Sequence, residues 1–193
     1  MLLAKSNNRG LAGETGSTLV EVIVSMLITV TALVSMAQLF AVSTGSNLAA
    51  RNNTFSTVLA EQKLEQIRSL TWGFDPQGLP LSDFTTDTSV SPEAPGGTGL
   101  QPSPGSALQQ NTVGYVDHVT ANGDIVGNGT QPPATAVYTR RWSIEPLPTN
   151  PNNTLIIQVL VTPNRVRGQA DQGNVGRLLD EARVITVKTR KAQ

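Results

Sequence analysis

The 193-residue sequence contains no cysteine and a single histidine, His118. A small extracytoplasmic domain can do without disulfides, so the missing cysteine does not assign a compartment. A hydrolytic triad or a zinc site would need partners for His118, and the adjacent Asp117 points to the opposite face if both lie in a strand. No glycine-rich phosphate loop stands between a strand and a helix. We therefore expect no enzymatic activity, no catalytic residue and no cofactor.

An excess of charge of either sign is also missing, because the formal net charge is zero. A neutral chain has no global attraction to nucleic acid or to acidic surfaces, so no nucleic-acid partner is expected. Three basic residues do gather at the C-terminus, Lys188, Arg190 and Lys191. We interpret them as a solvated tail.

Metal-ligating patterns are weak. Asp117, Asn122 and Asp124 could ligate calcium, but their spacing matches no full EF-hand loop, and turn chemistry accounts for them better. A second scattered set has the same weak status: Asp171, Asn174, Asp180 and Glu181. No metal site is predicted.

Proline is absent before Pro76, and no charged side chain occurs from Val22 to Ala50. Nothing in this part must kink a helix, so we expect one helix from Thr18 to about Leu70, with Gly45 as its weak point. At about 1.5 Å per residue, the uncharged run exceeds the roughly 30 Å of hydrocarbon that a membrane helix must cross.

A short polar leader precedes this run. It carries Lys5 and Arg9, and the stretch Gly16-Ser17-Thr18-Leu19-Val20-Glu21 follows. The positive-inside rule predicts a cytoplasmic leader and a domain that crosses the membrane after Ala50. An acid at the edge of a membrane span costs up to a few kcal/mol, so Glu21 requires a functional reason.

These residues, followed by the long apolar run, resemble the prepilin family: type IV pilins, their minor pilins and the pseudopilins of type II secretion. The resemblance implies that a prepilin peptidase cleaves between Gly16 and Ser17 and that the new N-terminus at Ser17 is methylated. Ser17 stands where phenylalanine is usual. Glu21 would then pair with an α-amino group, its own or that of a neighbouring subunit, and this pairing would reward assembly in register.

Two simpler interpretations compete with this one. The apolar run could be a secretory signal cleaved near Ala41, or a plain membrane anchor. A secretory signal has a shorter apolar region of about 7–15 residues and no acid where that region begins. A plain anchor has no need for Gly16 or Glu21.

Within the prepilin family, the subunit could belong to a type IV pilus, a type II secretion system or a competence system. The alternative from another class is a singly anchored extracytoplasmic binding domain that never polymerises.

Beyond Ala50 the pattern becomes amphipathic, which predicts a face that packs on a sheet. The apolar side carries Leu48, Phe55, Leu59, Ala60, Leu64, Ile67 and Leu70. The opposite side carries Arg51, Glu61, Glu65 and Arg68. Glu65 and Arg68 are spaced to pair, whereas Val58 and Lys63 break the pattern. The segment from Leu59 to Arg68 resembles PilV-like minor pilins.

The rest of the chain reads as a long loop followed by strands. Residues 74–112 are rich in proline, glycine, serine and threonine and predict a surface loop, in part disordered, with Trp72, Gly73 and Pro76 ending the helix. Asn122-Gly123 predicts a type I′ hairpin turn. Strands are expected at 113–119, 125–126, 137–145, 155–161 and 183–189, with a polar insertion at 164–179. Arg140 falls on the apolar face of its strand and is expected to snorkel or pair.

The predicted organisation is therefore an α+β pilin fold, with a long N-terminal helix packed on a small antiparallel sheet. Its parts are a leader peptide (1–16), a transmembrane and polymerisation half-helix (17–45), an amphipathic half-helix (46–72) and an extracytoplasmic sheet domain (73–193). The expected function is a minor pilin held in the bacterial inner membrane, single-pass with a periplasmic C-terminal domain, and later in a pilus or pseudopilus. Expected partners are the prepilin peptidase, other pilin subunits and the assembly platform.

Overall fold

The computed structural model describes residues 18–164 and 181–190. The chain forms two compact units, with the boundary between Ser46 and Asn47. Gly16, Ser17, most of the expected insertion at 164–179 and Lys191 lie outside the described residues. The same holds for Asp171, Asn174 and Asp180 of the second acidic set.

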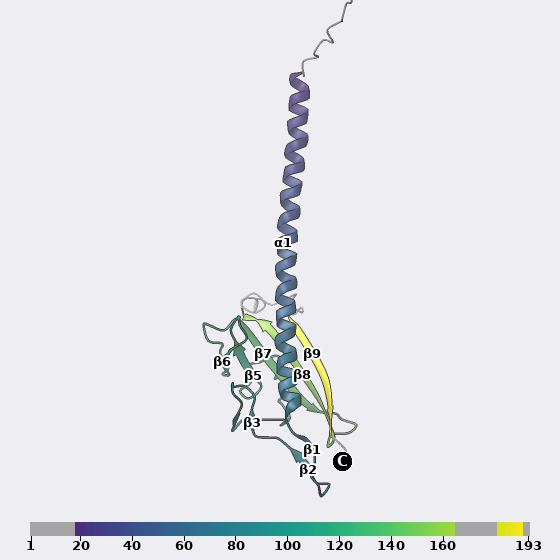
Figure 1. Ribbon diagram of the computed structural model, residues 1–193, viewed down its shortest axis with the longest axis vertical. Helices are drawn as coiled ribbons and strands as arrows, with labels where there is room; N and C mark the ends of the chain where they lie inside the picture. Colours follow the sequence, from purple (N-terminus) through teal and green to yellow (C-terminus); the bar gives the residue numbers. More distant parts are fainter. Residues whose placement is uncertain (1–17, 165–180, 191–193) are drawn as a thin grey trace, which may run out of the picture. The chain divides into compact units, whose positions relative to one another are not determined.

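One α-helix, α1, runs from Leu19 to Ser69, which confirms the predicted uninterrupted helix (Figure 1). The absence of proline allows this length, since each backbone N–H inside the helix finds its carbonyl four residues back. The helix starts after Thr18, whose Oγ1 accepts a hydrogen bond from the backbone N–H of Glu21 at 3.3 Å. Threonine followed three residues later by glutamate is the sequence pattern of a capping box.

The second unit (Asn47–Gln193), here called the sheet unit, is built around a five-stranded antiparallel sheet in the order β6-β5-β7-β8-β9. Its strands are β5 (Val116–Val119), β6 (Ile125–Gly127), β7 (Tyr138–Pro146), β8 (Thr154–Pro163) and β9 (Ala182–Thr189). The C-terminal turns of α1 lie across one face of this sheet (Figure 1). The arrangement of a long helix on antiparallel strands is the α+β class predicted from the sequence.

The core lies between the amphipathic turns of α1 and that sheet face. Leu59, Leu64 and Ile67 are buried against Tyr138 and Trp142. Alternate positions of β7 and β8 contribute further buried apolar members: Ile144, Leu155, Ile157, Val159 and Val161. The predicted docking of the half-helix on the sheet is confirmed. The exposed Glu65–Arg68 ion pair is also present, at 2.6 Å.

Two helix positions differ from the wheel prediction. Leu48 was placed on the packed face but is 54% exposed, because the buried positions of α1 begin only at Ser56. Lys63 breaks the amphipathic pattern, and its side chain is fully buried. A buried cation needs a compensating partner, and the partner comes from the sheet.

The expected loop at 74–112 is more structured than predicted. It contributes two small hairpins, β1 (Trp72–Phe74) with β2 (Pro80–Ser82), and β3 (Thr86–Asp87) with β4 (Ala94–Pro95). Leu100 and Ala107 are fully buried. Trp72 therefore belongs to a strand, and only the position of the helix end was predicted correctly. A few buried apolar residues order the segment, although others, such as Leu79 and Leu81, are exposed.

The β5–β6 hairpin also differs in detail. Strand β5 starts at Val116 rather than Val113, which is 64% exposed. The turn is closed by a hydrogen bond from Gly123 N–H to Thr120 O at 3.1 Å. Gly123 has φ of 91°, but no described non-glycine residue has positive φ. A type I′ turn needs positive φ at both central residues, so the predicted type is wrong.

Arg190 is not part of a solvated tail. Its guanidinium carbon lies 3.6 Å from the centroid of the Trp72 ring, and its nitrogens donate to the carbonyls of Gly73 and Asn152. Lys188 donates from Nζ to the carbonyl of Arg68. Both residues therefore tie the end of β9 to the end of α1 and to β1.

Candidate functional site

The N-terminal part of α1, from residue 18 to 46, presents an exposed apolar surface. All residues from 18 to 46 are exposed. Among the described residues, α1 is the one helix long and apolar enough to cross a membrane, with a mean hydropathy of 2.2 in a window of which nothing is buried. A core helix of a soluble domain is mostly covered, whereas this segment is exposed, so it is a candidate membrane span by its length and composition.

Three hydroxyl groups in the middle of this segment donate hydrogen bonds within the helix. Thr29 Oγ1 donates to Ser25 O at 2.7 Å, Thr31 Oγ1 to Leu27 O at 2.8 Å, and Ser35 Oγ to Thr31 O at 2.8 Å. Each hydroxyl thus satisfies its donor within the helix, which is what a polar group in hydrocarbon requires. Glu21 is the one charged residue between Thr18 and Ala50.

Glu21 occupies the first turn of α1 and is exposed. An acid in this position interacts favourably with the helix dipole, and its backbone N–H completes the Thr18 cap. The structure therefore provides a local role for Glu21 beside the assembly role implied by the resemblance. The cleavage and methylation residues, Gly16 and Ser17, lie outside the described residues.

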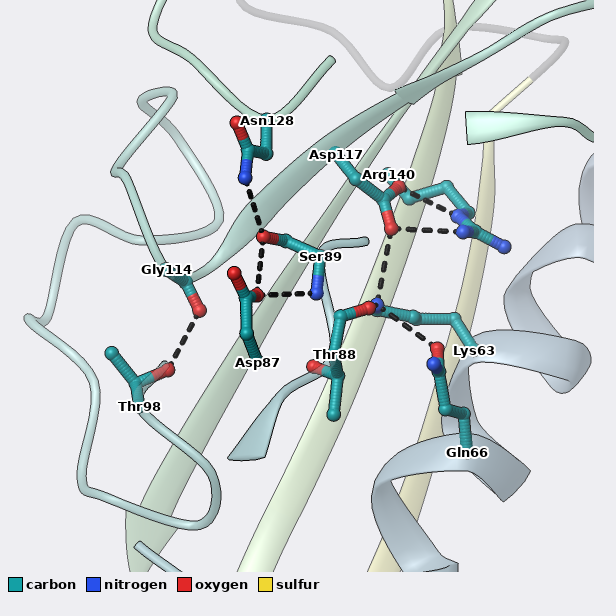
Figure 2. Close-up of polar contacts among 10 residues, drawn as sticks. All are labelled: Lys63, Gln66, Asp87, Thr88, Ser89, Thr98, Gly114, Asp117, Asn128 and Arg140. Atoms are coloured by element: carbon teal, nitrogen blue, oxygen red, sulfur yellow. Dashed lines mark hydrogen bonds and ion pairs between the residues drawn. The ribbon is translucent and has the colours of Figure 1, made fainter. Parts of the chain in front are cut away.

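A group of charged side chains lies buried in the sheet unit (Figure 2). Asp117 accepts two hydrogen bonds from Arg140, from Nε to Oδ1 at 2.7 Å and from Nη2 to Oδ2 at 2.8 Å. Lys63 Nζ approaches Asp117 Oδ2 at 3.0 Å. The two strands bring Asp117 and Arg140 together, because these residues are directly paired in the β5–β7 register. We name Lys63, Asp117 and Arg140 the buried triad.

Besides Asp117, Lys63 contacts residues of α1, of the loop after β3 and of β7. Its Nζ donates to Gln66 Oε1 at 3.1 Å and to the carbonyl of Thr88, and it lies 4.0 Å from the centroid of the Trp142 ring. Burial lowers the pKa of Lys63 to about 8, although the charge of Asp117 acts in the opposite direction. The ammonium therefore remains mostly protonated at neutral pH, and the triad carries two positive charges and one negative charge.

The loop that brings Thr88 to Lys63 is itself fixed by side chains. Asp87 Oδ1 accepts hydrogen bonds from both the backbone N–H and the hydroxyl of Ser89. Asn128 Nδ2 donates to Ser89 Oγ at 2.9 Å (Figure 2). This loop is thereby tied to the segment after β6, and the environment of Lys63 is preorganised.

His118 has a bracing role. Its ring is fully buried on the opposite sheet face from Asp117, as the alternation of the strand predicts. Nδ1 lies 3.0 Å from Thr139 Oγ1, and Nε2 lies 2.9 Å from Gly129 O. These contacts join β5 to β7 and to the segment after β6.

The calcium set considered in the sequence does not assemble. Asp117 is engaged by two cations inside the sheet unit, whereas Asn122 and Asp124 are exposed in the turn. Within residues 18–164 and 181–190, no three His, Asp or Glu side chains are grouped to hold a metal ion.

Sequence reasoning missed the buried triad, although its signal was present. Lys63 and Arg140 were both noted as charges on apolar faces, and Asp117 lies in a strand that is buried throughout. Two cations on apolar faces indicate a need for a buried acid, but nothing in the sequence marked Asp117 as that acid. Their pairing could not be derived without the strand register.

Comparison with known proteins adds no assignment: the chain matches no family model, no curated protein and no solved structure.

Proposed function

We propose that this protein is a non-enzymatic filament subunit of the type IV pilin class, in the role of a minor pilin. The observation that carries the proposal is an uninterrupted helix that begins at Leu19, within the stretch from Gly16 to Glu21, and whose first part is apolar. In such a subunit, lipid covers the exposed apolar surface from residue 18 to 46 before assembly, and the helices of neighbouring subunits cover it afterwards.

In this proposal, prepilin peptidase cleaves between Gly16 and Ser17, and the amino group of Ser17 is methylated. Before assembly, the subunit is a single-pass inner-membrane protein with the sheet unit in the periplasm. Glu21 pairs with the α-amino group of a neighbouring subunit as the helix leaves lipid for the filament. Opposite charges in a medium of low dielectric attract strongly, so the pairing selects one register of assembly.

The pseudopilin of a type II secretion or competence system shares this chemistry and stays the alternative within the class. A singly anchored binding domain is the alternative outside it. A membrane anchor is not cleaved by prepilin peptidase and so does not require a glycine at position 16. The mature N-terminus therefore separates the filament class from the anchored domain: a filament subunit begins at Ser17, and an anchored domain keeps the leader.

Substitution of Gly16 tests the proposal directly. In the native host, Gly16→Leu should block cleavage, so that mass spectrometry of the membrane fraction detects the full-length chain. Gly13→Leu is the matched control, because it places the same bulk in the same leader three residues earlier, and it should be cleaved like the wild type. Unchanged cleavage of Gly16→Leu, or a wild-type chain that keeps its leader, would contradict the prepilin assignment.

A further inference from the structure

A polar cavity of about 510 Å³ opens next to the buried triad, inside the unit that begins at Asn47. Its volume is within the range of about 300–1,000 Å³ that small-molecule sites occupy. Three segments distant in sequence build its walls: the helix α1, the loop before β4 and the β5–β6 turn. Arg140 completes the lining. The described lining residues are Gln62, Gln66, Ser91, Gly123, Asp124, Ile125 and Arg140.

Arg140 places a positive charge at the inner end of the cavity, and the residue is only 2% exposed. Its Nε and Nη2 are used by Asp117, which occupies one edge of the planar guanidinium. A guanidinium carries five N–H donors, so the other edge, formed by Nη1 and the second proton of Nη2, remains. Within the described residues no hydrogen-bond acceptor is recorded for Nη1, and Figure 2 shows the third guanidinium nitrogen pointing away from Asp117. That edge matches the two oxygens of a carboxylate.

Gln66 adds a second donor to the same cavity. Its Oε1 accepts the hydrogen bond from Lys63 Nζ, so the amide NH₂ is the group that remains for the cavity. The buried triad combines two cations, Lys63 and Arg140, with one anion, Asp117, so it carries one excess positive charge. The inner part of the cavity therefore offers donors and positive charge, which favours an anion.

The rim has a different character. Gln62, Ser91 and Asp124 are exposed and offer amide, hydroxyl and carboxylate groups. These groups pair with hydroxyls, and the Asp124 carboxylate disfavours a second negative charge on the ligand. The lining is mostly polar and contains no aromatic residue among those described, so an apolar ligand would gain little from it.

We propose that this cavity binds a small hydroxylated monocarboxylate of the sugar-acid class. The carboxylate lies on the free edge of Arg140 and receives a hydrogen bond from Gln66, and the hydroxyl groups contact Gln62, Ser91 and Asp124. The proposal depends on the sheet unit alone and is independent of the filament assignment.

The test uses the full-length chain in detergent micelles, labelled with ¹⁵N and titrated with sodium glucuronate. Trp142 supplies a reporter, since its ring lies next to Lys63. We expect saturable shifts of the Trp142 indole signal and of backbone signals at the β5–β6 turn. Glucose removes the charge, and N-acetylglycine keeps a carboxylate without the hydroxyl groups. Both should bind at least about tenfold more weakly than glucuronate.

Gln66→Glu is the decisive variant. Glutamate keeps an oxygen for Lys63 and the shape of the side chain, but replaces the cavity donor by a negative charge, so glucuronate affinity should fall at least about tenfold. Gln109→Glu adds the same charge at an exposed position that does not line the cavity and should bind like the wild type.

Gln62→Glu is a second variant at an exposed rim position, where no packing is at risk, and should weaken binding several-fold. The proposal is overturned if glucuronate produces no saturable shifts, or if glucose or N-acetylglycine binds as tightly. It is equally overturned if both cavity variants bind glucuronate like the wild type.

Discussion

Replacement of Lys63 by methionine tests how the sheet unit holds a buried cation. Burial lowers the pKa of Lys63 from 10.5 to about 8, with Asp117 opposing the change. Methionine keeps an unbranched apolar stem and removes the charge. Asp117 retains both hydrogen bonds from Arg140, so the variant leaves no buried carboxylate without a cation. The carbonyl of Thr88 does lose the Lys63 donor.

The magnitude follows from proton linkage. Each pKa unit corresponds to about 1.4 kcal/mol, so the lowering from 10.5 to about 8 corresponds to about 3 kcal/mol. Because the folded pKa is the lower one, the unfolded chain binds more protons between these two values, and wild-type stability rises with pH across that window. The contribution is complete above 10.5 and is lost as the pH falls through about 8.

The expected result is a pH-dependent difference between the two proteins. From about pH 7 to about pH 10.5, the free energy of unfolding of the wild type should rise relative to that of Lys63→Met by about 3 kcal/mol. The assay is urea unfolding of a fragment that begins at Asn47, monitored by the fluorescence of the two buried tryptophans, Trp72 and Trp142. Tyr115, whose pKa burial raises, is present in both proteins and cancels. A difference that stays constant over this range would refute the reasoning.

Three further predictions concern other parts of the chain. Leu64→Asp should unfold the fragment, since an unpaired buried charge costs several kcal/mol, whereas Val58→Asp at a 53% exposed position should leave circular dichroism and the unfolding midpoint nearly unchanged. Equal behaviour of the two variants would mean that the half-helix is not docked. Glu21→Gln should leave cleavage and membrane insertion intact but reduce incorporation into sheared filaments, tested in a strain without a wild-type copy. Glutamine preserves a capping box, so normal incorporation would reduce Glu21 to its local helix role. Arg190→Ala should lower the free energy of unfolding by about 1–2 kcal/mol through loss of stacking on Trp72 and of hydrogen bonds to backbone carbonyls, and an unchanged urea midpoint would contradict that account.

The helix was predictable because its determinants are local. The absence of proline before Pro76 allows a continuous hydrogen-bond ladder, and the uncharged run from Val22 to Ala50 makes the first part of the helix apolar, so its course from Leu19 to Ser69 needed no tertiary information. The strands β7, β8 and β9 were predicted to within one or two residues at each end, because alternation of apolar residues is also a local signal. The same holds for the exposed Glu65–Arg68 pair, which depends only on helical spacing.

The segment at 74–112 was misjudged for the opposite reason. Its composition is that of a loop, and its order depends on a few insertions such as Leu100 and on long-range hydrogen bonds. Thr98 Oγ1, for example, donates to Gly114 O at 2.8 Å, which joins two stretches that carry no common pattern (Figure 2). Contacts of this kind leave no periodic trace in the sequence.

The sequence by itself determined an apolar N-terminal helix with one acid at its start and an α+β domain behind it, since hydrophobic periodicity and the absence of helix breakers act over neighbouring residues. Only the tertiary structure decided the buried triad. Lys63, Asp117 and Arg140 meet because the β5–β7 register places Asp117 opposite Arg140 and because α1 docks with Lys63 facing them. A charge on an apolar face is tolerated only when a distant partner arrives, and the identity of that partner is a property of the fold.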